Sequence, residues 1–324
     1  MRLCLMTVVS DPFVYGALVM LKSFKATNPW FKGDIVVLWN PENAPLSDSS
    51  REILDGELSG ITYVEVDNDR YGEVFHFAET VVQTPQRLRA AFYILEAFHA
   101  KQYDRILTLD SDMLILGDLS RLFEIDEPFG VVRAFDHVKA LPLPYFNTGT
   151  MVVRHDTPEA LGFEDLRAAI RIDKIDKSHG KADQAVLNVA LRGSRKHFYD
   201  HRYNFSKRLC PYDRNRIEPF LKDKDVRVLH FLGEKPWNVK AKASEAEYQH
   251  LEMLWVRHLT KYCSRGTMFR YFRSVIRQVE TMRAALVPNN IPPNKRRQAE
   301  SAIMMKLQSE MYSKGEGVEL QAAG

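Results

Sequence analysis

The chain has 324 residues, of which 45% are hydrophobic and 27% are charged, and its formal net charge is +3. This length suffices for one large domain, or for one domain with a helical appendage, and it can bury a sizeable core. The small net charge excludes a protein that binds nucleic acid through its overall charge. The three cysteines have no metal-ligand spacing and leave an odd thiol, which favours a reducing, cytoplasmic compartment.

The N-terminal apolar run, residues 1–9, ends at Ser10-Asp11-Pro12. It is too short for the core of a signal peptide or for a membrane span, and no run of eighteen apolar residues occurs elsewhere. We interpret residues 1–9 as containing the first buried strand.

The N-terminal half alternates short β-branched runs with longer segments of helical period, as is typical of a mostly parallel sheet covered by helices. The predicted strands are Leu3–Val9, Asp34–Trp39, Thr62–Val66, Arg105–Leu109, Gly130–Ala134 and Gly149–Val153. The predicted helices are Val14–Ala26, Asp48–Leu58 and Gln86–Lys101. The sequence therefore predicts an α/β fold with one Rossmann-like domain, which binds its ligands at the carboxyl ends of the strands.

An acid pair stands at one of these strand ends. Asp110 and Asp112 follow an apolar run, and the chain then turns apolar again. On an extended segment, residues at i and i+2 point to the same side, so the two carboxylates can converge on one cation. Hard oxygen ligands suit Mg²⁺ or Mn²⁺ bound beside the phosphates of a substrate. The alternative is a solvated strand end with a capping aspartate.

Three later segments carry polar groups at element ends. Asn147 and Gly149 form a small turn ahead of an apolar strand, where an amide could meet sugar hydroxyls. Asp183 and Gln184 lie near the start of a predicted helix, Ala182–Leu191, where ordinary capping explains them equally well. A third segment closes the predicted strand Val226–Phe231 with a histidine, a glycine and a lysine within six residues.

Beyond residue 155 the alternation of strand-like and helical segments becomes less regular, with a further helix predicted near Pro158–Ile170. Beyond Tyr248 the sequence has a helical period and is rich in basic residues. Residues 257–300 hold ten Lys or Arg against two Glu. One helical face there carries Arg270, Arg273 and Arg277, and the opposite face carries Phe272, Val275, Ile276, Val279, Met282 and Leu286. This amphipathic pattern predicts either a packing helix or attachment to an anionic inner-leaflet membrane surface. We expect a catalytic domain at 1–250 and a basic helical extension at 251–324.

The ordered set of motifs resembles glycosyltransferase family 8, which includes glycogenin and bacterial lipopolysaccharide galactosyl- and glucosyltransferases. The matching motifs are Leu109-Asp110-Ser111-Asp112, Phe146-Asn147-Thr148-Gly149, Asp183-Gln184 with Leu187-Asn188, and His230-Phe231-Leu232-Gly233 leading to Lys235-Pro236-Trp237. The resemblance implies a GT-A type fold and the transfer of a hexose from a UDP-sugar to an acceptor hydroxyl, with retention of configuration.

The resemblance also implies a metal site and a donor site. The residues that match metal ligands, for Mn²⁺ or alternatively Mg²⁺, are Asp110, Asp112 and His230. The residues that match donor-binding positions are Thr7, Val9 and Phe13 around the base, Arg87 or Arg89, Ser111, Asp136, Gly149, and Gly233 with Lys235 at the phosphates. Glu234 alone separates that glycine from the lysine, whereas many members of the family have two residues there.

The residues that match the reacting sugar pocket are Asn147, Asp183 and Gln184. Retention requires either a carboxylate nucleophile or attack from the front face. Gln184 is a poor nucleophile, and Asp183 is the candidate nucleophile for the first route. We favour front-face transfer, with both residues positioning the sugar.

The expected partners are a UDP-sugar donor and a glycan or glycolipid acceptor. Nucleic acid is not expected as a partner, and a homo-oligomer is an open alternative. Two alternatives to transfer onto another molecule remain. Tyr212 precedes His230 at about the place of a priming tyrosine, so the chain could glycosylate itself as glycogenin does. It could also be a catalytically silent protein that binds nucleotide-sugars or acts as a scaffold. Glucose, galactose and glucuronic acid fit the named pocket residues equally.

Overall fold

The structure is a computed structural model that describes residues 1–172, 182–211, 216–238, 248–286, 295 and 298. The chain divides into two compact units. The first consists of residues 1–210 and 218–231, and the second of residues 211–217 and 232–324. The predicted domain boundary at residue 250 stays a prediction.

The first unit is built on a seven-stranded sheet in the order β3-β2-β1-β4-β7-β6-β8. Only β7 runs antiparallel to its neighbours, so the sheet is mostly parallel, as predicted. A smaller sheet has the order β5-β10-β9. The strands are β1 (Leu3–Val8), β2 (Asp34–Trp39), β3 (Ile61–Glu65), β4 (Arg105–Leu109), β5 (Met113–Ile115), β6 (Phe129–Asp136), β7 (Leu141–Arg154), β8 (His197–Tyr199), β9 (Phe205–Ser206) and β10 (Val228–His230).

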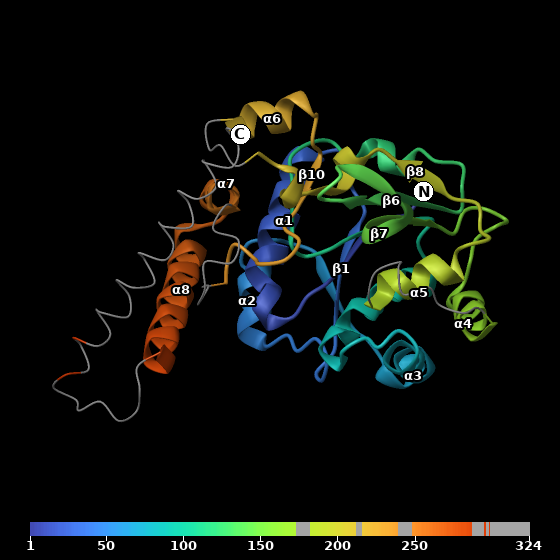
Figure 1. The fold of residues 1–324 in the computed structure, drawn as a ribbon, viewed down its shortest axis with the longest axis horizontal. Coiled ribbons are helices and arrows are strands. Elements are labelled where there is room, and N and C mark those ends of the chain that lie inside the picture. Colours follow the sequence, from blue (N-terminus) through green and yellow to red (C-terminus); the bar gives the residue numbers. More distant parts are fainter. Residues whose placement is uncertain (173–181, 212–215, 239–247, 287–294, 296–297, 299–324) are drawn as a thin grey trace. The chain divides into compact units, whose positions relative to one another are not determined.

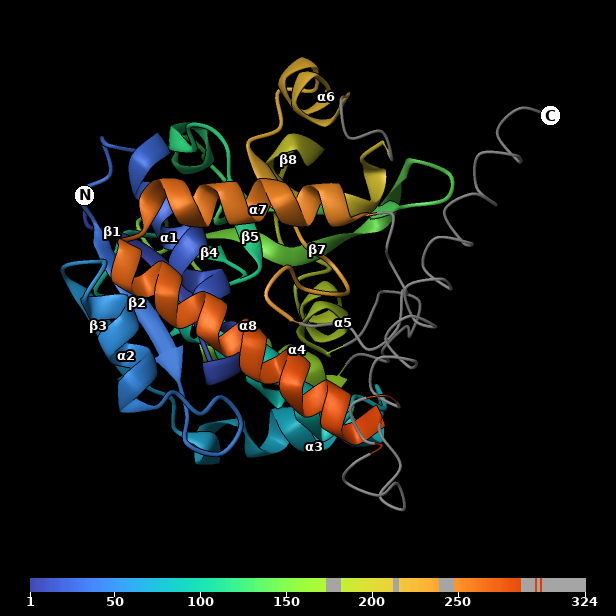
Figure 2. The same ribbon diagram turned by 90° about the vertical axis from the view of Figure 1, so that its left-hand side faces the viewer.

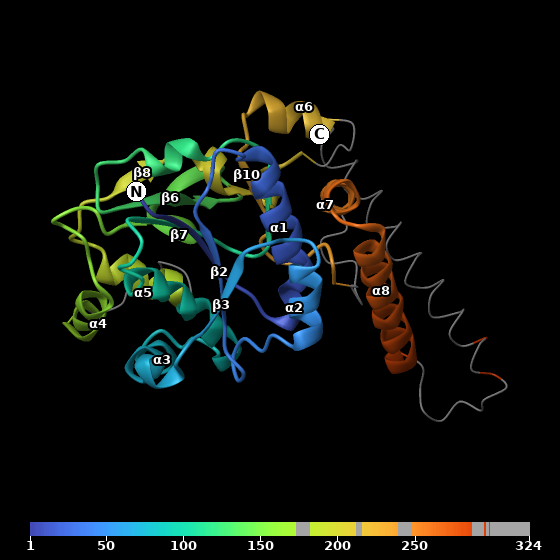
Figure 3. The same cartoon turned by 180° about the vertical axis from the view of Figure 1, so that it is seen from behind.

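Helices cover both faces of the large sheet. Figures 1 and 3 show α1 and α2 on one side and α3, α4 and α5 on the other. The α-helices are α1 (Val14–Thr27), α2 (Asp48–Asp55), α3 (Gly72–Thr80), α4 (Phe163–Ile172), α5 (Ala182–Ala190) and α6 (Ile217–Asp223). The longer 3-10 segments are η2 (Asn68–Tyr71), η3 (Gln86–Phe98), η4 (Ser120–Phe123) and η6 (His201–Asn204).

The alternation of side chains along the strands sorts the core into two layers. Cys4 and Met6 of β1 pack into a cluster with Phe92 and Tyr93 of η3. Val9, just beyond β1, belongs instead to a cluster that includes Ala17 of α1. Because side chains of a strand point alternately to the two faces, a sheet buried on both sides reads as a continuous apolar run, and this is how β1, β2 and β4 read in the sequence.

Two segments differ from the sequence prediction. The predicted α-helix Gln86–Lys101 is a 3-10 helix that ends at Phe98. Seven consecutive residues, 92–98, are buried there, so packing on all sides replaces the amphipathic period that the prediction assumed. The predicted strands at 130–134 and 149–153 belong to a longer hairpin of β6 and β7.

The second unit contains α7 (Gln249–Tyr262) and α8 (Arg265–Leu286), and Figure 2 shows how α8 starts where α7 ends and runs at an angle to it. The ring centroid of Trp255 lies 5.3 Å from that of Trp237 and 5.6 Å from that of Tyr271. Both tryptophans and Tyr271 are buried, so they form the aromatic core of this unit. Among the described residues, no helix has the length and hydropathy needed to cross a membrane.

The faces of α8 divide differently from the prediction. Tyr271 is buried, whereas Phe269, Phe272 and Ile276 are 68%, 45% and 57% exposed. The helix packs through the side that carries Tyr271, which was not part of the predicted apolar face. Phe272 and Ile276, which were part of it, are exposed to solvent. Tyr212, the segment 288–294 with its three prolines, and Arg296 and Arg297 lie outside the described residues.

Candidate metal and donor site

The sheet brings residues that are far apart in the sequence to one edge. Asp110 directly follows β4, and its backbone N–H donates to the Gly149 carbonyl at 2.9 Å. β5 then pairs antiparallel with β10 and sets His230 opposite Met113. The Phe231 N–H donates to the Asp112 carbonyl at 3.0 Å. This pairing closes the gap of about 120 residues between the acid pair and the histidine.

Asp110, Asp112 and His230 converge on one point. The Nε2 atom of His230 lies 3.2 Å from Asp112 Oδ1 and 3.6 Å from Asp110 Oδ2. One ligand atom from each residue lies within 4.8 Å of the other two. The side chains of His230 and Asp112 are 2% and 8% exposed, whereas that of Asp110 is 46% exposed. Two carboxylates and one imidazole nitrogen, open on one side, match the ligands of a divalent cation such as Mn²⁺.

Gly149 is pressed against this cluster. A Cβ atom built on Gly149 would lie 2.8 Å from Asp110 Oδ2 and 2.8 Å from His230 Cε1. The close approach arises from an irregularity in β7: Val131 of β6 faces Met151, but the next residue, Val132, faces Asn147. Residues 148–150 are therefore extra, and bulges of this kind commonly aim groups at a site. No residue larger than glycine fits at position 149 without moving the cluster.

A row of carboxamides extends from the histidine. His230 Nδ1 lies 2.8 Å from Asn204 Oδ1, and Asn204 Nδ2 donates to Asn147 Oδ1 at 2.7 Å. Asn147 Nδ2 donates in turn to Gln184 Oε1 at 2.8 Å. The structure thus joins the predicted residues Asn147 and Gln184 to His230. It does so through Asn204, which the sequence interpretation missed.

Asp183 is the second residue of helix α5 and lies near Asp110 and Thr148. The preceding residue, Ala182, has a φ of +53°, a conformation that is costly for a residue with a side chain. Burial raises the pKa of the Asp183 carboxyl to about 7, and the nearby charge of Asp110 adds to the rise, against hydrogen bonds from Thr148 and the Gln184 backbone. A cation bound nearby would reduce the repulsion between the carboxylates of Asp183 and Asp110.

The predicted base-binding residues lie at the end of β1. The side chains of Thr7 and Val9 are fully buried, so contact with a ligand would have to come from their backbone. Phe13 is half-buried at the end of a 3-10 turn that leads into α1.

The other predicted donor-binding residues of the first unit have structural partners of their own. Arg89 pairs with Glu79, with Nε 2.6 Å from Oε1, whereas Arg87 is exposed. Asp136 Oδ1 accepts the backbone N–H groups of Val138 and Lys139 and so caps the turn after β6. Ser111 is buried between the two acids. Of the two arginines, Arg87 is the one that we expect to reach a donor, because Arg89 is already paired.

Gly233 and Lys235 belong to the second unit. Gly233 has a φ of +83°, in the left-handed region that favours glycine. The segment that follows is anchored within this unit, where Gln278 Nε2 donates to the Trp237 carbonyl at 3.3 Å. The turn that carries Lys235 is therefore tied to α7 and α8.

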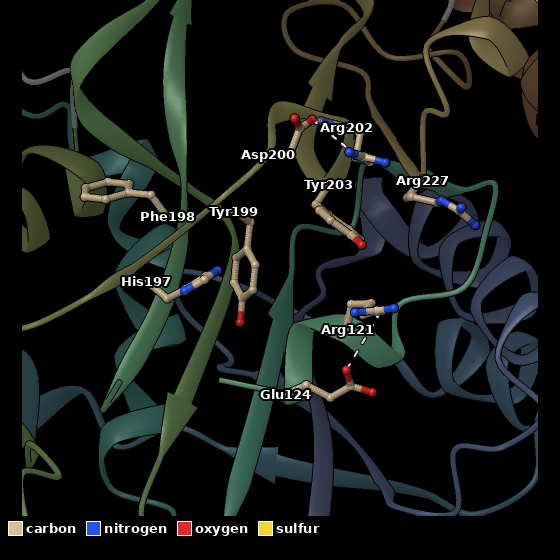
Figure 4. A pocket seen from close by; sticks show the side chains of 9 residues that line it. All are labelled: Arg121, Glu124, His197, Phe198, Tyr199, Asp200, Arg202, Tyr203 and Arg227. Atoms are coloured by element: carbon tan, nitrogen blue, oxygen red, sulfur yellow. Dashed lines mark hydrogen bonds and ion pairs between the residues drawn. The ribbon is translucent and has the colours of Figure 1, made fainter. Parts of the chain in front are cut away.

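A cavity of about 540 Å³ lies elsewhere on the first unit and is shown in Figure 4. Three arginines line it, and each pairs with a carboxylate: Arg202 and Arg227 with Asp225 at 2.7 and 2.8 Å, and Arg121 with Glu124 at 3.8 Å. None of the predicted site residues lines this cavity. Because its cations are already neutralised, we do not place the donor diphosphate there.

Comparison with known proteins is consistent with this geometry. The sequence profile of Glycosyl transferase family 8 matches residues 4–241. Glycogenin-1 of Mus musculus is 26% identical over 236 residues, which cover 71% of this chain and 63% of that protein. Glycosyltransferase GlyE of Streptococcus pneumoniae is 26% identical over 179 residues, which cover 51% of this chain and 42% of that protein. The matches thus span less than two thirds of either relative.

Among solved structures, the galactosyltransferase LgtC in complex with donor and acceptor sugar analogues aligns with a TM-score of 0.55 and 18% sequence identity. The alignment covers 82% of this chain and 99% of LgtC. At this identity the likeness concerns the fold alone, and it confirms the predicted GT-A type α/β architecture.

Proposed function

The chain belongs to glycosyl transferase family 8, and on this premise we propose that it moves a hexose from a UDP-sugar to an acceptor hydroxyl, with retention and with a divalent cation. The observation that carries the proposal is the convergence of Asp110, Asp112 and His230 at the carboxyl edge of the sheet. Ligands of open α/β sheets bind at this edge. The ligand set suits Mn²⁺, and Mg²⁺ is the second choice.

The reaction breaks the bond between the anomeric carbon and a diphosphate oxygen, and it forms a bond from that carbon to the acceptor oxygen. The departing diphosphate gains negative charge while the sugar passes through an oxocarbenium-like state. A cation held by Asp110, Asp112 and His230 would supply Lewis-acid stabilisation of that charge. Lys235 would add a positive charge at the phosphates, and Gly233 would allow the backbone to approach them.

The proposed sugar pocket consists of Asn147, Asp183 and Gln184. Asn147 fixes the carboxamide of Gln184 through its Nδ2, so Gln184 meets the sugar in one orientation. We propose front-face transfer, in which these residues hold the sugar and the acceptor proton passes to the departing diphosphate. Mass spectrometry with a slow donor tests this step, because a glycosyl adduct on Asp183 would show a double displacement instead.

The remaining donor contacts are also proposed. Thr7 and Val9 would receive the base through their backbone at the end of β1, with Phe13 stacking beside it. Arg87 would reach the diphosphate from η3. Ser111, Asp136 and Gly149 would complete the donor site.

We propose that α8 contacts an anionic membrane surface on the cytoplasmic side, where a lipid-linked acceptor would be found. Phe269, Phe272 and Ile276 form an exposed apolar stripe at spacings of three and four residues. Arg270, Arg273 and Arg277 are exposed along the same helix. Apolar side chains flanked by arginines are typical of helices that lie in a lipid interface.

A donor panel tests the proposed function. The purified chain is incubated with UDP-glucose, UDP-galactose and UDP-glucuronic acid, each with Mn²⁺ and with excess chelator, and released UDP is measured. We expect hydrolysis of one donor that requires the cation. Equal UDP release in chelator would contradict the metal-dependent mechanism, and no hydrolysis of any donor would favour a silent binding protein. Intact mass after the same incubation detects self-glycosylation.

A further inference from the structure

We propose that Asn204 is a positioning residue that holds the imidazole of His230 in the form that binds a cation and links it to the sugar pocket. This inference rests on the proposed function, because it concerns the same metal site. Asn204 ends the turn η6 directly before β9, and β9 pairs with β10, the strand that ends at His230. The strand pairing therefore sets the carboxamide beside the imidazole.

The direction of the hydrogen bonds follows from one backbone group. The Gly149 N–H can only donate, and it donates to Asn147 Oδ1 at 2.9 Å. The group of Asn204 that faces the same oxygen at 2.7 Å must therefore be its amino group. This leaves Asn204 Oδ1 toward His230 Nδ1, 2.8 Å away, where only a protonated Nδ1 can donate.

The consequence for His230 is a fixed ring. With its proton held on Nδ1, the imidazole presents Nε2 to the carboxylates, 3.2 Å from Asp112 Oδ1. The nitrogen that binds a metal is set by the hydrogen bond that the other nitrogen makes. Without the acceptor on Asn204, the ring could carry its proton on Nε2 or rotate, and a cation would have to reverse that change before binding.

The same row of amides reaches the sugar pocket. Asn147 has its Oδ1 engaged by Gly149 and Asn204, so its Nδ2 is directed to Gln184 Oε1 at 2.8 Å. The Gln184 carboxamide is therefore oriented through Asn147, which the Gly149 N–H and the Asn204 amide hold together. We infer that ordering of His230 by a bound cation also orders Gln184.

Two substitutions separate the two halves of this row. In Asn204→Asp a carboxylate oxygen still accepts from His230 Nδ1, but the other oxygen now opposes Asn147 Oδ1. In Asn204→Leu both hydrogen bonds are lost. A matched control is Asn28→Leu, because Asn28 is an asparagine whose amide likewise makes two hydrogen bonds, accepting from Leu119 N and donating to Phe24 O, outside this row.

The experiment measures Mn²⁺ affinity of the full-length metal-free proteins by electron paramagnetic resonance of free Mn²⁺, with donor hydrolysis as the second readout. We expect Asn204→Leu to weaken Mn²⁺ binding by about 10- to 100-fold, as is usual when the partner of a metal-binding histidine is lost. Asn204→Asp should bind Mn²⁺ nearly as wild type does and yet hydrolyse the donor more slowly. Asn28→Leu should lower the melting temperature and leave Mn²⁺ affinity unchanged.

The outcomes distinguish a failure of the proposed role of Asn204 from a failure of the proposed metal site. Wild-type Mn²⁺ affinity in folded Asn204→Leu would overturn the role of Asn204 alone. If Asn204→Leu does not fold, Asn204→Asp carries the test, and equal loss of Mn²⁺ binding and of hydrolysis in that variant would show a merely structural residue. A wild-type chain that binds no Mn²⁺ would overturn the metal site itself.

Discussion

The carboxyl edge of the central sheet and the helix α8 use polar side chains in different ways. At the sheet edge, His230 and Asp112 are almost wholly buried, and hydrogen bonds to Asn204 and Phe231 fix their geometry. On α8, Arg270, Arg273 and Arg277 project into solvent beside exposed apolar residues. Groups that are held by directional contacts can perform chemistry, whereas exposed charges act collectively on a surface. Substitutions should therefore have steep effects in the first region and graded effects in the second.

The largest effect is expected for Asp112→Asn, which removes one buried charge from the metal cluster. A Lewis-acid cation contributes several kcal/mol and about 1.4 kcal/mol corresponds to tenfold, so donor hydrolysis should fall on the order of a thousandfold. Released UDP and the circular dichroism spectrum are measured together. Asp223→Asn, which removes an exposed charge from α6, is the matched control and should hydrolyse the donor normally. Full activity of folded Asp112→Asn would remove this residue from the metal site.

A smaller but still steep effect is expected for Gly149→Ala. The added methyl would meet Asp110 and His230 at 2.8 Å and displace them, although the chemical groups of the cluster are unchanged. A displacement near 1 Å can cost about a hundredfold in rate. Gly193→Ala is the control, because nothing lies within 4 Å of the Cβ position there. Hydrolysis by Gly149→Ala at the rate of this control would show that the cluster tolerates displacement.

The proposed membrane contact of α8 is tested by the double substitution Phe272→Ser and Ile276→Ser. Since burial of a large apolar side chain contributes about 1.5–3 kcal/mol, affinity for vesicles that contain anionic lipid should fall at least about tenfold. Donor hydrolysis in the absence of membranes should be unchanged. Val138→Ser, at a 94% exposed residue of the first unit, is the control. Vesicle co-sedimentation as strong as that of wild type would refute the membrane role of α8.

The last expected effect is on folding rather than on activity or membrane binding, and it is a change of stability with pH. In the metal-free protein the pKa of Asp183 is about 7 when folded, against an ordinary value of 3.8, so the folded state binds more protons between these values. The free energy of unfolding should therefore fall as pH rises from about 4 to about 7. Urea unfolding with chelator, at about pH 5 and about pH 8, should show a weaker decline in Asp183→Asn than in wild type. An identical decline in both proteins would assign the pH dependence to other groups.

Much of the sheet could be predicted because its strands are short apolar runs with clear ends. The predicted bounds Asp34–Trp39 and Arg105–Leu109 agree with the structure. The acid pair could be assigned to a strand end for the same reason. In contrast, η3 could not be predicted as a 3-10 helix, because its winding depends on the packing that surrounds it.

Less of the candidate site than of the sheet could be predicted from the sequence. His230 could be linked to Asp110 and Asp112 only through the family resemblance, since the contact depends on the pairing of β5 with β10. Asn204 follows no periodic pattern, and its role arises from a contact with a residue 26 positions away. The signal available in the sequence was an asparagine directly before the short segment Phe205–Ser206, which a turn explains equally well.

The most direct test of the central claim is anomalous diffraction at the manganese edge from crystals grown with Mn²⁺ and UDP. The account predicts one strong anomalous peak in contact with Asp110, Asp112 and His230, beside the diphosphate of UDP. A diphosphate bound at that edge without such a peak, or a peak held by other residues, would contradict it.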